Sequence, residues 1–122
     1  MNVYISRPLL RFQRFFCRTV CTNGRLTYPD GSFVFYEKRS AVKQDLPGII
    51  YCCGYDSNLY KKKPSHLDKV SGELGISCVR FDYTGHEFSS GQLSDLTLFS
   101  SKQNTLDVLD QLTEGIKLLC LY

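Results

Sequence analysis

The sequence predicts an α/β domain built on a parallel sheet, and three observations indicate it. Residues 49–53 form a continuous apolar run closed by a glycine, which is typical of a strand buried on both faces. A helical segment and a second β-prone run follow, in the order of a strand, helix, strand unit. The composition, 43% hydrophobic over 122 residues, fits one small globular domain.

A hairpin is expected ahead of the parallel strands. Two β-prone runs, residues 26–28 and 32–37, flank the tripeptide Pro29, Asp30, Gly31. These three residue types favour a tight turn for different reasons, because proline fixes φ, aspartate bonds to nearby backbone and glycine accepts positive φ.

The first crossover helix is expected to begin at Pro64 and to end at Gly75. Proline is tolerated at the first helical position, and glycine supplies the left-handed residue that ends a helix. Leu67, Val70 and Leu74 recur at i, i+3 and i+7, which predicts one apolar helix face.

The remaining chain predicts two more strands and one more helix. Residues 76–81 form the second parallel strand, a Gly- and Ser-rich loop covers residues 84–94, and residues 116–122 form a third strand. A helix between them is expected to end at Gly115. Its apolar and acidic faces consist of Leu106, Leu109 and Leu112, opposed by Asp107, Asp110 and Glu114. The expected fold is therefore a hairpin followed by βαβαβ, with an incomplete sheet.

The N-terminal segment is basic and amphipathic. It has no acidic residue before Asp30 and contains Arg7, Arg11, Arg14, Arg18 and Arg25. An arginine-rich, acid-free, amphipathic segment is typical of a mitochondrial transit peptide, which is predicted over residues 1–25. The alternative is a helix that binds a membrane surface, or a plain extension.

Charge and cysteine content exclude several classes of protein. The net charge of +3 is too small to predict a nucleic-acid partner. Cys52, Cys53 and Cys78 lie in apolar runs, so they are expected to be reduced core residues. The spacing of Cys17 and Cys21 is not that of a zinc site, and no metal or cofactor is expected. No apolar run approaches the roughly 20 residues that cross a bilayer.

A phosphate-binding module is the rival from another class. The loop at residues 54–58 contains neither G-x-G-x-x-G nor G-x4-G-K-[ST], and Asp56 would repel a phosphate. The lysines at residues 61–63 could contact phosphates but are more simply a solvated surface.

Two separated motifs resemble the α/β-hydrolase family. They are PGIIYCCGYDSN at residues 47–58 and VRFDYTGHEFSSG at residues 79–91, and the likeness extends over residues 45–118. Within that family the chain is similar to the mitochondrial esterases that cleave acyl-protein (palmitoyl-protein) thioesters and acyl glucuronides. The resemblance implies a serine hydrolase of carboxylic esters or thioesters, a mitochondrial location, an acyl ester or thioester substrate and no cofactor.

The resemblance also assigns site residues. Gly54 and Tyr55 match the oxyanion-hole loop, in which the backbone N–H of Tyr55 would be one of two donors. Without the resemblance, Gly54 would simply permit a tight turn. Asp82 and Gly85 are expected to shape the loop after the second strand, and His86 to be a loop residue. Neither Asp82 nor His86 belongs to the triad, which in this family follows the order Ser, Asp or Glu, His.

The chain departs from the family pattern at two places. Glu87 stands where the pattern has a second glycine, which questions a loop conformation that needs positive φ. No G-x-S-x-G follows the third strand, and Cys120 has no partner base nearby in sequence. The resemblance therefore implies that the nucleophile, acid and base all lie beyond Tyr122.

We accordingly expect residues 26–122 to be a truncated hydrolase domain that ends before the nucleophile elbow and is inactive alone. The alternative is a non-catalytic isoform or a small interaction module that associates through an open sheet edge.

Overall fold

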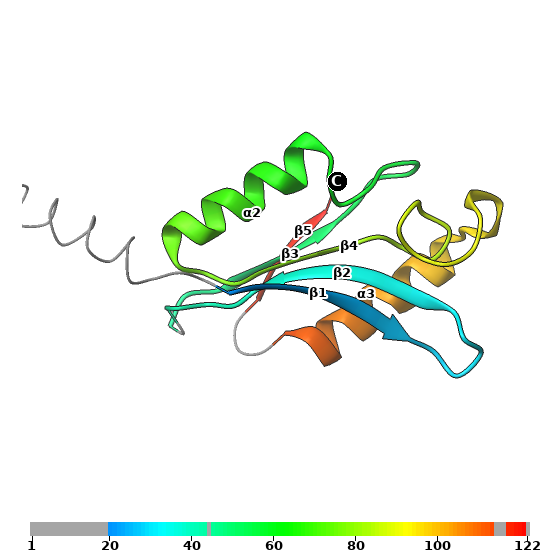
Figure 1. Ribbon diagram of the computed structural model, residues 1–122, viewed down its shortest axis with the longest axis horizontal. Coiled ribbons are helices and arrows are strands. Elements are labelled where there is room, and N and C mark those ends of the chain that lie inside the picture. Colours follow the sequence, from blue (N-terminus) through cyan, green and yellow to red (C-terminus); the bar gives the residue numbers. More distant parts are fainter. Residues whose placement is uncertain (1–19, 44, 114–116, 122) are drawn as a thin grey trace, which may run out of the picture.

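One five-stranded sheet forms the centre of the fold (Figure 1). The computed structural model describes residues 20–43, 45–113 and 117–121, the last of these as backbone only, so residues 1–19 of the expected leader lie outside the described residues. The elements are β1 (Cys21–Thr27), β2 (Phe33–Arg39), β3 (Gly48–Cys52), α2 (Lys62–Leu74), β4 (Cys78–Phe81), the 3-10 turn η1 (Leu93–Asp95), α3 (Leu98–Leu112) and β5 (Lys117–Leu121).

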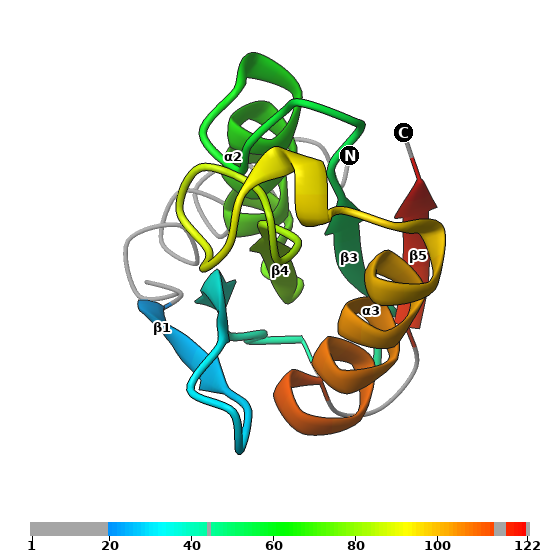
Figure 2. The same cartoon turned by 90° about the vertical axis from the view of Figure 1, so that its right-hand side faces the viewer.

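The strand order is β1-β2-β4-β3-β5, and it confirms the expected α/β fold class. β3 pairs in parallel with both β4 and β5, as the βαβαβ order predicts. The hairpin strand β2 pairs antiparallel with β1 and with β4, so it joins the hairpin to the parallel strands. Figures 1 and 2 show α2 on one face of the sheet and α3 on the other.

The third parallel strand, β5, lies where the sequence predicts it. Its described bounds are Lys117–Leu121, inside the expected range of residues 116–122. Tyr122, the residue beyond which the resemblance places the reacting groups, lies outside the described residues, and so do Glu114 and Gly115.

The expected end of the preceding helix at Gly115 is wrong. α3 ends at Leu112, and Thr113 follows in an extended conformation with φ −127° and ψ 150°. The hydroxyl of Thr113 donates to the carbonyl of Leu109 in the last turn, so a side chain supplies a donor to that carbonyl. A β-branched residue in extended conformation thus ends the helix ahead of the glycine.

The hairpin turn has the chemistry that its sequence predicts. Gly31 adopts φ +86°, and its N–H donates to the carbonyl of Tyr28 at 3.0 Å. Asp30 accepts the backbone N–H of Ser32 at 2.9 Å. The folded domain was expected to begin at residue 26, but β1 begins at Cys21. Pairing with β2 along the whole of β1 holds this polar segment in the sheet.

Among the residues whose side chains are described, two apolar clusters form the core, one on each face of the sheet. Successive β3 side chains point to opposite faces, so Ile50 and Cys52 pack with Val108 of α3, while Tyr51 and Cys53 pack on the side of α2. Cys52, Cys53 and Cys78 are buried and form no disulfide among the described residues, which agrees with their expected role as reduced core residues.

The bounds of α2 agree with the sequence at one end and differ at the other. The helix ends at Gly75, which adopts φ +73° as expected of a glycine stop. It begins at Lys62, so Pro64 occupies the third helical position and not the first. Proline is tolerated there because N–H groups of the first turn have no intrahelical acceptor.

The face that α2 buries is not the predicted apolar one. Its buried residues are Pro64, Asp68 and Ser71, whereas Leu67 and Val70 are half-buried and Leu74 is 52% exposed. The reason is ionic: arginines of the sheet face the helix and neutralise its buried aspartate.

α3 is also rotated from the expected face. It buries Asn104, Val108 and Leu112, while Leu109 packs partly against the core and Leu106 is 42% exposed. Two long-range hydrogen bonds account for the rotation. The hydroxyl of Tyr28 donates to Asp107 at 2.7 Å, and the N–H of Thr84 donates to Asn104 at 2.9 Å. The helix therefore presents a partly polar face to the hairpin and the loop after β4.

Replacing Thr97 by alanine is expected to destabilise the fold by about 1 kcal/mol. Thr97 caps α3: its hydroxyl accepts the N–H of Ser100 at 3.0 Å, and the hydroxyl of Ser100 accepts the N–H of Thr97 at 3.0 Å. Alanine leaves that first-turn N–H without its acceptor. Urea unfolding measures the loss, and Thr97→Ser, which keeps the oxygen, is the control; an equal loss in both variants would contradict the capping role.

Candidate functional site

The loops after β3 and β4 meet at one edge of the sheet, where the carboxyl ends of the parallel strands lie (Figures 1 and 2). This is the edge at which ligands bind in open α/β sheets. An open groove of about 460 Å³ separates the two loops there. Its lining comes from Asp56, Ser57, Asn58 and Lys61 on one side and from Gly85, His86, Glu87, Gly91, Gln92 and Leu93 on the other.

The first loop leaves β3 through Gly54 and Tyr55. Tyr55 is 75% exposed, and its backbone N–H makes no hydrogen bond among the described residues. Asp56 follows with φ +52°, a left-handed conformation in a residue other than glycine. Such a conformation persists only where the surroundings hold it, and it turns the chain sharply just after Tyr55.

Asp82 lies directly after β4 and is fully buried. Its Oδ1 accepts the backbone N–H of Leu59 at 2.8 Å, and its Oδ2 accepts that of Phe88 at 3.1 Å. Burial raises the pKa of Asp82 to about 6, and the two N–H donors limit the rise because they favour the ionised form. The carboxylate thus ties the loop after β3 to the loop after β4.

Gly85 and Glu87 shape the second loop in different ways. Gly85 adopts φ +100°, and a Cβ there would lie 2.8 Å from the carbonyl oxygen of Gln92, so this position needs glycine. Glu87 does not have a positive φ, and its carboxylate accepts a hydrogen bond from the Asn58 side chain at 2.8 Å. The departure from the family pattern at Glu87 therefore costs no backbone strain and adds a tie between the loops.

His86 lies in the loop after β4, as expected, and is buried there. It is 3% exposed, and neither ring nitrogen has a hydrogen-bond partner among the described residues. Its ring contacts that of Tyr83 edge-on, with 5.5 Å between centroids. Burial lowers the pKa of His86, while the nearby carboxylate of Asp56 opposes the change. The imidazole is thus held neutral at the floor of the groove.

Replacing His86 by phenylalanine is expected to stabilise the fold by about 1 to 2 kcal/mol at pH 7, because two unpaired buried nitrogens are removed and the ring is kept. Since the folded pKa is below 6.5, the unfolded chain binds more protons, and the contribution of His86 to stability is lost as pH falls below 6.5. The advantage of the variant should therefore grow between pH 7 and pH 5.

Urea unfolding of both proteins across this pH range measures the difference. The comparison is made at each pH, because Asp82, with its raised pKa, changes stability in the opposite sense. A constant difference at all pH values would contradict a buried neutral imidazole. His66→Phe, at an exposed position on α2, is the matched control and should change little.

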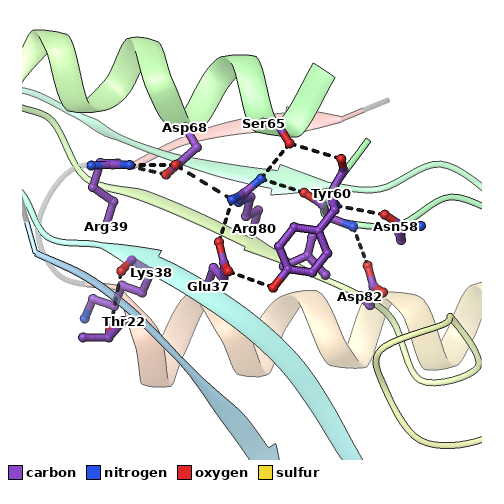
Figure 3. A network of polar contacts seen from close by, with 11 residues as sticks. Thr22, Glu37, Lys38, Arg39, Asn58, Tyr60, Ser65, Asp68, Arg80 and Asp82 are labelled. Atoms are coloured by element: carbon purple, nitrogen blue, oxygen red, sulfur yellow. Dashed lines mark hydrogen bonds and ion pairs between the residues drawn. The ribbon is translucent and has the colours of Figure 1, made fainter. Parts of the chain in front are cut away.

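A partly buried ionic network, with Arg80 and Asp68 buried at its centre, lies beside the site, between the sheet and α2 (Figure 3). Arg80 of β4 donates to Glu37 of β2 at 2.5 Å and lies 3.9 Å from Asp68 of α2. Arg39 donates twice to Asp68, at 3.0 and 2.8 Å, and the hydroxyl of Tyr60 donates to Glu37 at 2.8 Å. No local pattern in the sequence predicts this network. The one sign of it in the sequence is Arg80, an arginine inside an otherwise apolar strand.

The described residues contain no group of three His, Cys, Asp or Glu side chains placed to hold a metal ion. Within the same residues, no helix has the length and apolarity that crossing a membrane requires.

Comparisons with known proteins give mostly relatives of one name, together with a probable cytoplasmic histidine--tRNA ligase of Vairimorpha ceranae that is 31% identical over 79% of this chain and 22% of its own length. No model of a protein family matches the chain. It is 31% identical, over 98% of its length, to mitochondrial palmitoyl-protein thioesterase ABHD10 of Homo sapiens, and 31% identical, over 84%, to the protein of that name in Rattus norvegicus. The chain spans 39% of the human relative and 34% of the rat one.

Solved structures agree with these relatives. The alpha/beta hydrolase domain-containing protein 10 from mouse superposes with a TM-score of 0.73 and 29% identity, over 82% of this chain and 39% of the mouse chain. A putative hydrolase from Agrobacterium vitis superposes with a TM-score of 0.71 and 27% identity, over 76% of this chain and 37% of the other. Since sequence relatives and superposed structures agree on the fold around the two loops, the chain belongs to the α/β-hydrolase family.

Proposed function

We propose that the chain is part of a serine hydrolase that cleaves carboxylic esters or thioesters, and that Gly54 and Tyr55 form one half of its oxyanion hole. The observation that carries the proposal is the backbone N–H of Tyr55, which lies just after β3 and has no acceptor among the described residues. The names of the relatives, palmitoyl-protein thioesterases, support the thioester as substrate class.

An N–H in this place would act on the transition state. When a nucleophile attacks an acyl carbon, the carbonyl oxygen gains negative charge, and a fixed donor about 3 Å away stabilises that charge. Because the donor belongs to the backbone, the Tyr55 side chain is free to vary. Removing one such donor typically lowers kcat by about 10² to 10³.

A chimera tests this role. We would replace the matched segment of the human relative by residues 20–121 and measure thioester hydrolysis. Tyr55→Pro removes the N–H and should lower kcat by about 10²-fold or more with a smaller change in KM. Tyr55→Phe keeps the N–H and is the control. Equal activity of the two variants would exclude Tyr55 as a donor, provided that circular dichroism shows both to be folded.

We further propose that the nucleophile, the acid and the base of such a hydrolase are not among the residues of this chain. The sequence contains no G-x-S-x-G. The hydroxyl of Ser89 donates to the backbone carbonyl of Asp82, not to its carboxylate, and neither nitrogen of His86 has a partner among the described residues. A fluorophosphonate probe is therefore expected not to label the 122-residue protein. Covalent labelling at any serine would overturn this proposal.

We also propose a mitochondrial location, with the arginine-rich N-terminal segment as the transit peptide. Because β1 begins at Cys21, this peptide would end ahead of the expected residue 25. The acid-free, arginine-rich composition of that segment and the printed location of the relatives support it. A fluorescent protein fused to residues 1–30 should enter mitochondria, and the same fusion with its arginines replaced by glutamine should not. Diffuse cytosolic fluorescence of the first fusion would contradict the proposal.

A further inference from the structure

The backbone of Leu59 is held on both sides by side chains of the β4 segment. Leu59 is fully buried. Its N–H donates to Oδ1 of Asp82 at 2.8 Å, and its carbonyl oxygen accepts from Nη1 of Arg80 at 2.8 Å. Arg80 and Asp82 (Figure 3) are two residues apart along an extended segment, so their side chains project to the same face and bond to the two polar backbone groups of Leu59.

The same aspartate also reaches the beginning of the loop. The thiol of Cys53 donates to the carbonyl of Phe81 at 3.4 Å and lies 3.9 Å from Oδ1 of Asp82. The carboxylate oxygen that accepts from Leu59 therefore also contacts the residue just before Gly54. Residues 54–58 form a short closed loop whose two ends meet at Asp82.

A loop closed at both ends on one carboxylate has little freedom to reorient. The left-handed residue Asp56 lies within it, and the tie between Asn58 and Glu87 fixes its outer part. The N–H of Tyr55 lies between these constraints. Its direction is consequently set by the closure of the loop, since its own side chain is exposed and makes no hydrogen bond among the described residues.

We infer that Asp82 and Arg80 are positioning residues that aim the backbone N–H of Tyr55 by closing the loop at residues 54–58. This role rests on the proposed oxyanion function of Tyr55. Neither side chain would contact a substrate. Arg80 is itself held by Glu37 and Asp68, so the ionic network under α2 supports the donor geometry at the sheet edge.

Protonation of Asp82 should loosen the loop at residues 54–58, because it changes how the carboxyl group accepts hydrogen bonds. An ionised carboxylate accepts both N–H donors, from Leu59 and Phe88, whereas the protonated acid has one oxygen that must act as a donor. The pKa of Asp82 is raised to about 6, first by burial and further by Glu87. Two other titratable groups interact with it, the thiol of Cys53 and the hydroxyl of Tyr60. Burial raises the pKa of each to about 12, so both stay neutral between pH 8 and pH 4.5.

Amide NMR of the 15N-labelled 122-residue protein, titrated from pH 8 to pH 4.5, tests the inference. The N–H signals of Leu59 and Phe88 are expected to shift with a midpoint near pH 6, the pKa of their acceptor. The N–H signal of Tyr55 should shift with the same midpoint, because the closed loop moves with the carboxylate. A purely structural Asp82 would move Leu59 and Phe88 but leave Tyr55 unchanged, and that result would overturn the inference.

Two variants separate the possible sources of the shift. His86, whose pKa burial lowers, lies close to Asp56, so the experiment is repeated in His86→Phe, where the midpoint of the Tyr55 signal should persist. Asp82→Asn should abolish the pH-dependent shift of the Tyr55 signal, whereas Asp110→Asn, at an exposed position of α3, should leave it unchanged. If Asp82→Asn does not fold, the wild-type titration still decides the matter.

The titration requires no catalysis, so the inference and the proposed function can fail separately. A Tyr55 signal that follows Asp82, combined with an inactive chimera, would keep the loop closure and remove the oxyanion role. An active chimera that depends on the Tyr55 N–H, combined with a Tyr55 signal independent of Asp82, would do the reverse.

Discussion

Replacing Arg80 by methionine is expected to lower the free energy of unfolding by about 3 to 5 kcal/mol, a large part of the stability of a small domain. Arg80 is 7% exposed and faces two carboxylates, those of Glu37 and Asp68. Methionine fills similar space without charge, so both carboxylates lose a buried cationic partner. The carbonyl of Leu59 also loses its donor.

The unpaired Nε of Arg80 should reduce this loss of stability. It has no hydrogen-bond partner among the described residues, so the substitution also removes one unsatisfied donor. That gain, about 1 to 3 kcal/mol at most, is smaller than the loss of the charge that two carboxylates require.

Urea unfolding measures the effect, and two variants control it. Arg25→Met removes an exposed arginine that lies over the ring of Phe33 and should cost less than about 1 kcal/mol. The double variant Glu37→Gln, Arg80→Met should recover part of the loss, because one of the stranded carboxylates is gone. A loss as small as that of Arg25→Met would show that the network is solvated and not buried.

Truncating Phe81 to alanine is expected to cost about 3 to 5 kcal/mol. Phe81 is fully buried on the face of the sheet that α3 covers, in the same cluster as Val79 and Val108. Its ring also meets that of Tyr83 edge-on at 5.3 Å between centroids. Alanine would leave a cavity between the sheet and α3 that neighbouring strands and the helix could fill only in part.

Phe81→Leu and Phe99→Ala are the matched controls. Leucine keeps most of the buried volume and should cost clearly less than alanine. Phe99 is 76% exposed near the beginning of α3, so its truncation should change the free energy of unfolding little. If Phe99→Ala cost as much as Phe81→Ala, the assignment of the core to the opposite side of α3 would be wrong.

The family motifs could be found from the sequence because they lie in short, continuous segments. Gly54 and Tyr55 follow an apolar strand directly, and Asp82 follows the next one. Their hydrogen bonds could not be found in this way. The partner of Asp82 at Leu59 is 23 positions away, and His86 becomes buried only because the loops fold over it.

The sequence by itself determined the elements whose signals are local: the turn at Gly31, the buried strand β3 and the end of α2 at Gly75. Only the tertiary structure decided which helix faces are buried. Glu37 and Arg80, 43 positions apart, become neighbours when β2 pairs with β4, and their network extends to Asp68. Hydrophobic periodicity predicts that charged residues face the solvent. It therefore cannot predict a buried charge whose partner lies on a strand distant in sequence.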